Sequence, residues 1–218
     1  MMYSVKEIFS SVQGEGARAG RLSVFCRFAG CNLWTGREDD RNNAVCKFCD
    51  TDFVGVDGQY GGKYKSADDL AREIDTRWKA VTSSDKFKYV VLTGGEPLLQ
   101  ADEALIEALH EFGFEVALET NGTILPPKGI DWICVSPKAG SKLVVLKGDE
   151  LKLVIPQIGW PISEADLDYY EQLDFNNFYL QPMDAKNYWN NVHEVLDIIN
   201  SRPLWNIGLQ IHKILKVD

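Results

Sequence analysis

The stretch that most constrains this chain spans residues 31–52 and contains three cysteines, Cys31, Cys46 and Cys49. The last two form a C-x-x-C pair, and fourteen residues separate Cys31 from Cys46. Thiolates bind soft metals and iron–sulfur clusters, and a C-x-x-C pair reaches one centre from a single tight turn. Three ligands leave a fourth position open, which is typical of a reactive centre, whereas a structural zinc site would need a fourth ligand elsewhere. The cysteines alone are compatible with either kind of site.

The other two cysteines, Cys26 and Cys134, lie in apolar segments. Residues 22–28 are typical of a β-strand in which Val24, Cys26 and Phe28 face the same side. We therefore expect Cys26 and Cys134 to be small core residues rather than ligands. The N-terminal sequence lacks the basic and apolar pattern of a signal peptide, so five cysteines indicate free or metal-bound thiols in a reducing cytoplasm.

Length, composition and charge narrow the class of protein further. With 218 residues, of which 45% are hydrophobic, we expect one globular domain over residues 1–218 with a substantial core. The net charge of -9 and the lack of a basic stripe argue against nucleic acid as a direct partner. No apolar run reaches the length of a membrane span, so no membrane contact is expected.

Short apolar runs typical of strands recur along the chain, at residues 22–28, 89–92, 114–118, 132–135, 151–155, 178–180 and 207–211. Helical spacing is found after Ser66, between Pro97 and Gly113, after Ser163 and over residues 189–200. Strands joined through helices or crossover loops pair in parallel. A complete eight-stranded barrel takes about 250 residues, so the shorter chain predicts an α/β fold, an abridged open parallel (β/α) barrel of about six core strands.

Polar clusters follow five of the predicted strands directly. They are Thr93-Gly94-Gly95-Glu96, Glu119-Thr120-Asn121, Ser136-Pro137-Lys138, Gln181-Pro182-Met183-Asp184 and His212. The carboxyl ends of parallel barrel strands share one face, and active sites lie on that face. The sequence therefore predicts one active site at this end of the barrel.

The three cysteines, with Gly94-Gly95-Glu96-Pro97 at a strand end, resemble the radical S-adenosylmethionine superfamily. The common spacing there is C-x3-C-x2-C, from which the fourteen-residue gap departs. Over nearly its full length the sequence is similar to one family of that superfamily, the 7-carboxy-7-deazaguanine synthases, including a subgroup with the longer gap. The similar segments are Val5–Phe9, Gln13–Gly16, Cys49–Thr51, Thr93–Pro97, Glu119–Gly122, Ser136–Lys138, Gln181–Asp184 and His212–Lys213.

The resemblance implies a lyase reaction of queuosine biosynthesis, a tRNA-modification pathway. Cys31, Cys46 and Cys49 would hold a [4Fe–4S] cluster whose open iron binds S-adenosylmethionine. Reductive cleavage would give a 5′-deoxyadenosyl radical that takes a hydrogen from 6-carboxy-5,6,7,8-tetrahydropterin. Ring contraction and loss of ammonia would then give 7-carboxy-7-deazaguanine. The family also implies a homodimer and a flavodoxin-type electron donor.

The resemblance also assigns roles to residues, which we take as expectations. S-adenosylmethionine would contact Phe48, Cys49, Asp50, Gly94, Gly95, Glu96, Ser136, Pro137, Lys138, Gln181, Pro182, Met183 and Asp184. The substrate would contact Val12, Gln13, Gly14, Arg27, Thr93 and the terminal carboxylate of Asp218. Catalytic roles would fall to Glu15, Glu119 and His212, and a substrate-bridging Mg²⁺ would be bound by Thr51. A guanidinium such as that of Arg27 suits a carboxylate, and pterin N–H donors suit carboxylate acceptors.

Two alternatives remain open at the level of sequence. A different radical S-adenosylmethionine enzyme, such as an activase that makes glycyl radicals, would retain the cysteines and the Gly-Gly-Glu segment but would not need a set of residues that binds a pterin. A zinc-stabilised binding module would explain the cysteines without catalysis. Metal and sulfide analysis after anaerobic purification distinguishes these alternatives, because zinc without sulfide would support the binding module.

Overall fold

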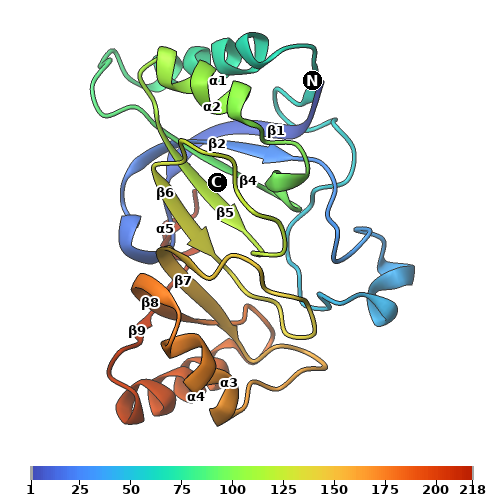
Figure 1. Ribbon diagram of the computed structural model, residues 1–218, viewed down its shortest axis with the longest axis vertical. Coiled ribbons are helices and arrows are strands. Elements are labelled where there is room, and N and C mark those ends of the chain that lie inside the picture. The colour runs from blue at the N-terminus through green and yellow to red at the C-terminus, as the bar shows by residue number, and fades with distance from the viewer. Residues whose placement is uncertain (1, 218) are drawn as a thin grey trace.

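The computed structural model describes residues 2–217 and contains a single nine-stranded sheet (Figure 1). The strands are β1 (Tyr3–Val12), β2 (Leu22–Phe28), β3 (Gly62–Tyr64), β4 (Tyr89–Gly94), β5 (Glu115–Thr120), β6 (Trp132–Val135), β7 (Lys147–Ile155), β8 (Asp174–Pro182) and β9 (Asn206–Ile207). Their order is β3-β1-β2-β4-β5-β6-β7-β8-β9. From β2 to β9 neighbouring strands are parallel, whereas β1 is antiparallel to both β2 and β3.

Four of the five α-helices lie where the sequence predicts helices, whereas β5, β6 and β7 follow one another without a helix between them. The α-helices are α1 (Ala67–Val81), α2 (Glu103–Glu111), α3 (Glu164–Glu171), α4 (Tyr188–Ser201) and α5 (Ile211–Leu215), with 3-10 turns η1 (Gly16–Arg18), η2 (Glu38–Asn43) and η3 (Pro97–Leu99). The Ser66 hydroxyl accepts the Asp69 amide at 3.1 Å, and Ser163 forms a capping box with Asp166. Both caps satisfy amides that a helix start leaves free.

Helices α1 to α4 pack on one face of the sheet, and the apolar core lies between them and the strands. In Figure 1, α1 and α2 lie at one end of the molecule and α3 and α4 at the other. Every second residue of a strand faces these helices. Cys26 of β2 is therefore buried in the core beside α1, as predicted, and Leu151 of β7 is buried in the core that includes Leu167 of α3.

The alternate residues of the same strands face the inner side of the curved sheet. They include Phe25, Arg27, Thr93, Glu119, Ser136, Lys152, Val154 and Gln181, all of which line one cavity. The two-residue period of the strands thus separates an apolar outer face from a polar inner face. The fold places the polar ends of β2, β4, β5, β7 and β8 around a shared space.

The prediction of about six core strands is confirmed, because β2 and β4 to β8 are the six longer strands of the parallel part of the sheet, to which the two-residue strand β9 is added at the edge. The prediction of a final strand over residues 207–211 is wrong. Only Asn206–Ile207 pair with β8, and the chain then turns so that the Ile211 amide donates to Gly14 O at 2.9 Å. His212 therefore belongs to α5. Asp218 lies outside the described residues.

Across residues 2–217, none of the helices combines the length and apolar character that crossing a bilayer requires.

Candidate active site

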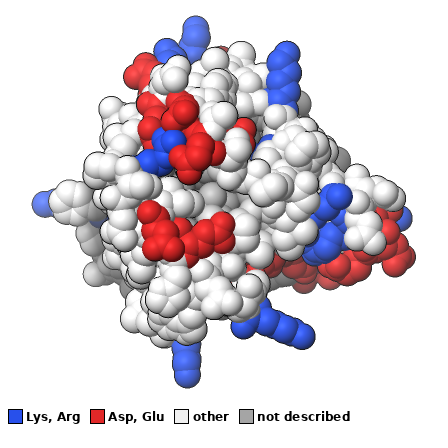
Figure 2. All heavy atoms as spheres, turned by 90° about the horizontal axis from the view of Figure 1, so that it is seen from below, with Lys and Arg blue, Asp and Glu red and all other residues white. Residues whose placement is uncertain are grey.

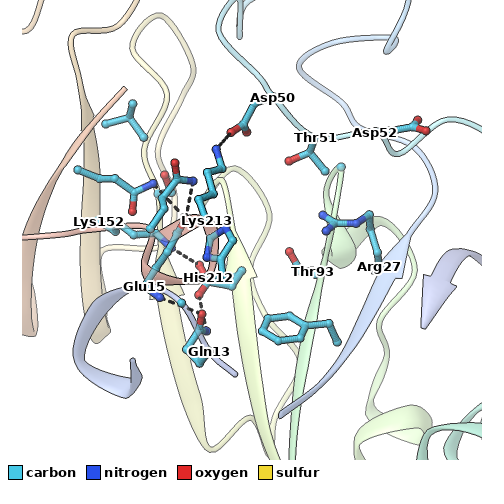
Figure 3. A pocket seen from close by; sticks show the side chains of 18 of the residues that line it. Gln13, Glu15, Arg27, Asp50, Thr51, Asp52, Thr93, Lys152, His212 and Lys213 are labelled. Atoms are coloured by element: carbon cyan, nitrogen blue, oxygen red, sulfur yellow. Dashed lines mark hydrogen bonds and ion pairs between the residues drawn. The ribbon is translucent and has the colours of Figure 1, made fainter. Parts of the chain in front are cut away.

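A cavity of about 430 Å³ opens at the carboxyl ends of the parallel strands (Figure 3). Thirteen of the residues predicted to form the site line it, namely Val12, Gln13, Gly14, Glu15, Arg27, Asp50, Thr51, Thr93, Gly95, Glu119, Ser136, Gln181 and His212. They come from separate strands and loops along the chain. The sheet therefore brings together residues that are far apart in the sequence, as the barrel prediction requires.

Other predicted residues do not line the cavity. These are Cys31, Cys46, Phe48, Cys49, Gly94, Glu96, Pro137, Lys138, Pro182, Met183 and Asp184. Conversely, the wall includes eight residues that the sequence analysis did not place at the site, namely Glu7, Phe9, Phe25, Asp52, Lys152, Val154, Gln210 and Lys213, and two, Thr120 and Asn121, that it placed only in a polar cluster at a strand end. Lys152 is the only charged residue in the apolar run of residues 151–155, but that pattern alone does not show which groups it contacts.

One pole of the cavity presents a guanidinium. Arg27 Nε donates to Glu7 Oε1 at 2.7 Å, a pair that the antiparallel register of β1 and β2 sets directly opposite. The Arg27 guanidinium lies 5.7 Å from the ring centroid of Phe9, and Phe9 stacks on Phe25 at 5.0 Å. In Figure 3, Arg27 lies on the same side of the cavity as Thr51 and Thr93. This pole combines a fixed cation with a flat apolar surface.

The opposite pole presents two carboxylates joined by a buried lysine. Lys152 Nζ lies 2.5 Å from Glu15 Oε2 and 2.9 Å from Glu119 Oε2. Gln210 Nε2 donates to Glu15 Oε1 at 2.8 Å, and Gln13 Nε2 donates to Glu119 Oε1 at 3.4 Å. Burial alone would raise the pKa of Glu15, but the charge and hydrogen bond of Lys152 lower this pKa to about 2. Glu15 is therefore ionised at neutral pH.

The C-terminal helix α5 closes the open side of the cavity. The His212 ring lies against Gly14, where a Cβ atom would collide with its imidazole. Burial lowers the pKa of His212, and the charge of Glu15 opposes the shift only in part. Lys213 Nζ pairs with Asp50 at 3.0 Å and with Asp184 at 2.6 Å. These pairs connect α5 to the end of β8 and to residues 31–52, which we call the cysteine loop (Figure 3).

The three cysteines predicted as ligands come from one loop beside the cavity. Cys46 and Cys49 share a hydrogen bond that lowers the pKa of Cys49 and raises that of Cys46. Burial raises the pKa of Cys31 and the charge of Cys49 adds to that shift, whereas the Leu33 amide, which donates to Cys31 Sγ at 3.4 Å, opposes it. Of the three cysteines, Cys49 is therefore the one whose pKa is moved towards the thiolate, the form that binds iron.

Within residues 2–217, no three His, Cys, Asp or Glu side chains converge closely enough to hold a single metal ion. A cubane cluster binds each cysteine through a different iron, so it requires three thiols around one space rather than three around one ion. Cys31, Cys46 and Cys49 are candidates for that weaker requirement, because one loop carries all three and each of Cys31 and Cys46 lies near enough to Cys49 for its charge to act on them. The residues fit a [4Fe–4S] cluster.

Arg41 holds the cysteine loop from within the fourteen-residue gap. Its Nη1 donates to the carbonyl oxygens of Lys47 and Cys49, both at 3.1 Å, and its guanidinium lies 3.9 Å from the Trp34 ring centroid. Glu38 accepts from Arg41 Nε at 2.8 Å. The long gap therefore forms an ordered structure around the C-x-x-C turn rather than a loose insertion.

The Gly94-Gly95 pair allows this loop to lie close to the end of β4. A Cβ on Gly94 would collide with the backbone of Phe28, and one on Gly95 would lie 2.8 Å from Cys31 Cβ. Glu96 is completely buried, and its carboxylate accepts from Leu98 N at 3.0 Å and Asn121 N at 2.8 Å. The Glu96 side chain thus joins the ends of β4 and β5, while Gly95 forms the cavity wall.

Lys138 lies between the cysteines and the cavity. Its Nζ donates to the carbonyl and hydroxyl oxygens of Ser136, both at 2.6 Å, and lies 6.0 Å from the Phe48 ring centroid. Burial lowers the pKa of Lys138, while the charges of Cys46 and Cys49 act in the opposite direction. The site therefore places a half-buried lysine beside the thiols.

Acidic side chains form patches on one end of the molecule. Figure 2, which shows the molecule of Figure 1 from below, has Asp and Glu side chains gathered in patches on this face, while most Lys and Arg side chains stand apart from one another. The turn η2 in the cysteine loop begins with Glu38, Asp39 and Asp40. A continuous basic band of the kind that binds nucleic acid is not seen on this face.

Comparisons with known proteins agree with the geometry. The model of the Radical SAM superfamily matches residues 41–147. The chain is 57% identical to the 7-carboxy-7-deazaguanine synthase of Bradyrhizobium diazoefficiens and 54% identical to that of Bordetella pertussis, in each case with all of both chains covered. The crystal structure of QueE from Escherichia coli superimposes with a TM-score of 0.71 over 96% of this chain and 94% of that one, at 23% identity, which shows a shared fold.

Proposed function

The chain belongs to the 7-carboxy-7-deazaguanine synthase family of radical S-adenosylmethionine enzymes, which act in 7-deazapurine and queuosine biosynthesis, and we propose that it converts 6-carboxy-5,6,7,8-tetrahydropterin to 7-carboxy-7-deazaguanine with loss of ammonia. The observation that supports this substrate is the pair of opposite poles in one cavity, with Arg27 at one and Glu15 and Glu119 at the other. The substrate has matching ends, a carboxylate and an edge of N–H donors.

The family implies a [4Fe–4S] cluster and S-adenosylmethionine. When bound, they supply the 5′-deoxyadenosyl radical that removes a hydrogen atom from the substrate. Cys31, Cys46 and Cys49 would hold the cluster. Gly95, Ser136 and Gln181 line the cavity next to the cysteine loop, and with the other predicted contacts they would bind S-adenosylmethionine.

Residues of the cavity would bind and orient the substrate. Arg27 would pair with the substrate carboxylate, while Phe9 and Phe25 provide a flat surface beside it. Glu15 and Glu119 would accept hydrogen bonds from the pterin edge. His212 has a lowered pKa, so it would be neutral at neutral pH and able to accept a proton at an imidazole nitrogen.

Two proposals concern partners. We propose a flavodoxin-type electron donor and a homodimer, both supported by the family resemblance. The cysteine loop projects from one side of the molecule in Figure 1, which leaves it approachable from outside. Reduction of the bound cluster by purified flavodoxin and sedimentation of the purified protein test the two proposals separately.

We also propose that Thr51 binds a Mg²⁺ ion that bridges to the substrate. Thr51 lines the cavity between Asp50 and Asp52, on the side of Arg27 (Figure 3). Mg²⁺ prefers oxygen ligands and often takes one or two from protein while substrate and water provide the others. We expect Mg²⁺ to stimulate turnover of the native enzyme several-fold and Thr51→Ala to weaken that stimulation. A titration of Mg²⁺ measures both, and an unchanged response of Thr51→Ala would remove Thr51 from the site.

The proposed reaction is tested directly with reconstituted enzyme. The protein is purified anaerobically, its iron and sulfide are measured, and it is incubated with S-adenosylmethionine, dithionite and 6-carboxy-5,6,7,8-tetrahydropterin. We expect 7-carboxy-7-deazaguanine and ammonia as products. Cleavage of S-adenosylmethionine without a deazaguanine product would favour another radical enzyme, and zinc without sulfide would favour a binding module.

A further inference from the structure

The buried lysine of the cavity carries an inference that goes beyond the roles assigned above. The Lys152 side chain is 6% exposed and lies in β7, between two carboxylates that come from different parts of the chain, Glu15 after β1 and Glu119 in β5. All three side chains line the cavity. Burying a charged lysine at the wall of a binding site costs free energy of desolvation, so its position there indicates a role for the charge.

We propose that Lys152 is a positioning residue that holds Glu15 and Glu119 ionised at the same time, so that this pole of the cavity only accepts hydrogen bonds and selects a ligand edge made of N–H donors. The inference rests on the proposed function, because the ligand is the pterin. The charge effect itself concerns the protein alone and can be measured without a ligand.

The first step of the argument is electrostatic. Two carboxylates that share a buried site without a cation do not both ionise, because the like charges raise one of the two pKa values. Lys152 lies within hydrogen-bonding distance of both, so it offsets that repulsion. The lowered pKa of Glu15 and the raised pKa of Lys152, which the two carboxylates raise against the effect of burial, agree with this arrangement.

The surrounding groups do not replace Lys152. Glu150 and Cys134 also face it, from β7 and β6, and neither brings positive charge. His212 acts on Glu15 from α5, but burial lowers the pKa of that imidazole. Lys138 already donates to Ser136. Lys152 is therefore the cation that contacts both carboxylates in the part of the chain that the structure describes.

The second step concerns what the pole offers to a ligand. Gln181 Nε2 donates to Glu15 Oε1 at 3.2 Å, which leaves Gln181 Oε1 buried without a hydrogen-bond partner within residues 2–217. An unpaired buried acceptor costs free energy until a donor reaches it. Glu15 and Glu119 thus present the acceptors of this pole on the cavity wall, beside Gln181. The amino group and ring N–H of a pterin supply adjacent donors, whereas an edge of acceptors would be repelled.

The test compares three variants of reconstituted enzyme with S-adenosylmethionine present and reductant absent, so that binding occurs without turnover. Lys152→Met removes the charge and keeps the length of the side chain, and Lys152→Arg keeps the charge. Lys88→Met is the matched control, because Lys88 is also 6% exposed and pairs with two carboxylates, Asp75 and Asp85, away from the cavity. Calorimetry gives the Kd of 6-carboxy-5,6,7,8-tetrahydropterin from pH 6 to 8.

We expect the native enzyme, Lys152→Arg and Lys88→Met to bind with nearly the same Kd at every pH in this range. In Lys152→Met one carboxyl group should keep a proton at pH 6, and binding must then release it. Affinity should therefore be lost as pH falls, by up to about tenfold per pH unit, because each bound ligand displaces one proton. A pH-independent Kd in Lys152→Met, whether weakened or unchanged, would overturn the inference.

An infrared measurement separates this inference from the proposed substrate. Without any pterin, Lys152→Met should show the carbonyl stretch of a protonated carboxyl group at pH 6 that disappears by pH 8 and that is absent from Lys152→Arg. If the native enzyme binds no pterin, the proposed function fails while the infrared result still decides whether Lys152 keeps both carboxylates ionised. If the band is absent from Lys152→Met, the inference fails even when the native enzyme makes the expected product.

Discussion

Replacement of Cys31, Cys46 or Cys49 by alanine is expected to abolish cluster assembly and all turnover. Each thiolate would bind a different iron of the cluster, so no neighbouring side chain can take over a lost position. The three cysteines lie in one loop, so the loss of any one of them is expected to have the same effect on the cluster. Iron and sulfide analysis, together with the absorbance of the cluster, measures the effect before any assay of activity.

The same chain provides two matched controls. Cys26 and Cys134 are fully buried in β2 and β6, and burial raises the pKa of both thiols. Cys26→Ala and Cys134→Ala should retain the cluster and lower the free energy of unfolding by about 1 kcal/mol, which is typical of a small core deletion. If Cys26→Ala loses iron while Cys31→Ala keeps it, the assignment of the ligands is wrong.

The part of the fold that the sequence predicts well is the part governed by local patterns. Alternation in β2 correctly separates Cys26, which is in the core, from Arg27, which is in the cavity. The caps at Ser66 and Ser163 depend on side chains only three residues away, and both form. Residues at the carboxyl ends of parallel strands lie close together because the barrel topology places all of these ends on one face.

The part that the sequence analysis missed depends on contacts between distant segments. Strand β1 was not predicted, although its register with β2 places Glu7 beside Arg27. The segment around His212 has strand-like residues, but Gly208 bonds to Leu180 O and Ile211 bonds to Gly14 O, so the chain leaves the sheet and enters α5. No residue pattern within either segment predicts these contacts.

Lys152 and Arg41 were missed for a different reason. A lysine in an apolar strand and an arginine in a long loop are each compatible with a solvent-exposed side chain, which is the usual outcome. Their partners lie elsewhere in the chain, Glu15 and Glu119 for Lys152, and the Cys49 carbonyl for Arg41. A charge placed between other charges can be recognised only after the fold brings them together.

Arg27→Lys is expected to raise the KM for 6-carboxy-5,6,7,8-tetrahydropterin by about 10- to 100-fold, because charge-assisted hydrogen bonds of this kind contribute about 1.5–3 kcal/mol. Within residues 2–217, Glu7 accepts a hydrogen bond from Nε of Arg27 at 2.7 Å, and the two terminal nitrogens of the guanidinium remain for a ligand. Two parallel N–H groups match the two oxygens of a carboxylate, whereas the single ammonium of lysine would pair with Glu7 instead. Binding of S-adenosylmethionine should not change.

Arg21→Lys is the matched control. Arg21 lies just before β2 and donates to Glu115 at 2.6 Å while its guanidinium lies 3.8 Å from the Tyr89 ring centroid, so it resembles Arg27 in chemistry but lies outside the cavity wall. Its replacement should leave both affinities unchanged. Equal loss of substrate and S-adenosylmethionine binding in Arg27→Lys would indicate a folding role.

The same interaction can be tested by removing the carboxylate from the substrate instead of the guanidinium from the enzyme. Tetrahydropterin without the 6-carboxylate should bind the native enzyme about as weakly as the complete substrate binds Arg27→Lys, and the variant should bind both ligands alike. Such non-additivity is expected when two changes remove the same interaction. If the 6-carboxylate improves binding to Arg27→Lys as much as it does to the native enzyme, another group holds it. Lys213 would be the next candidate, because it lines the same cavity and already pairs with Asp50.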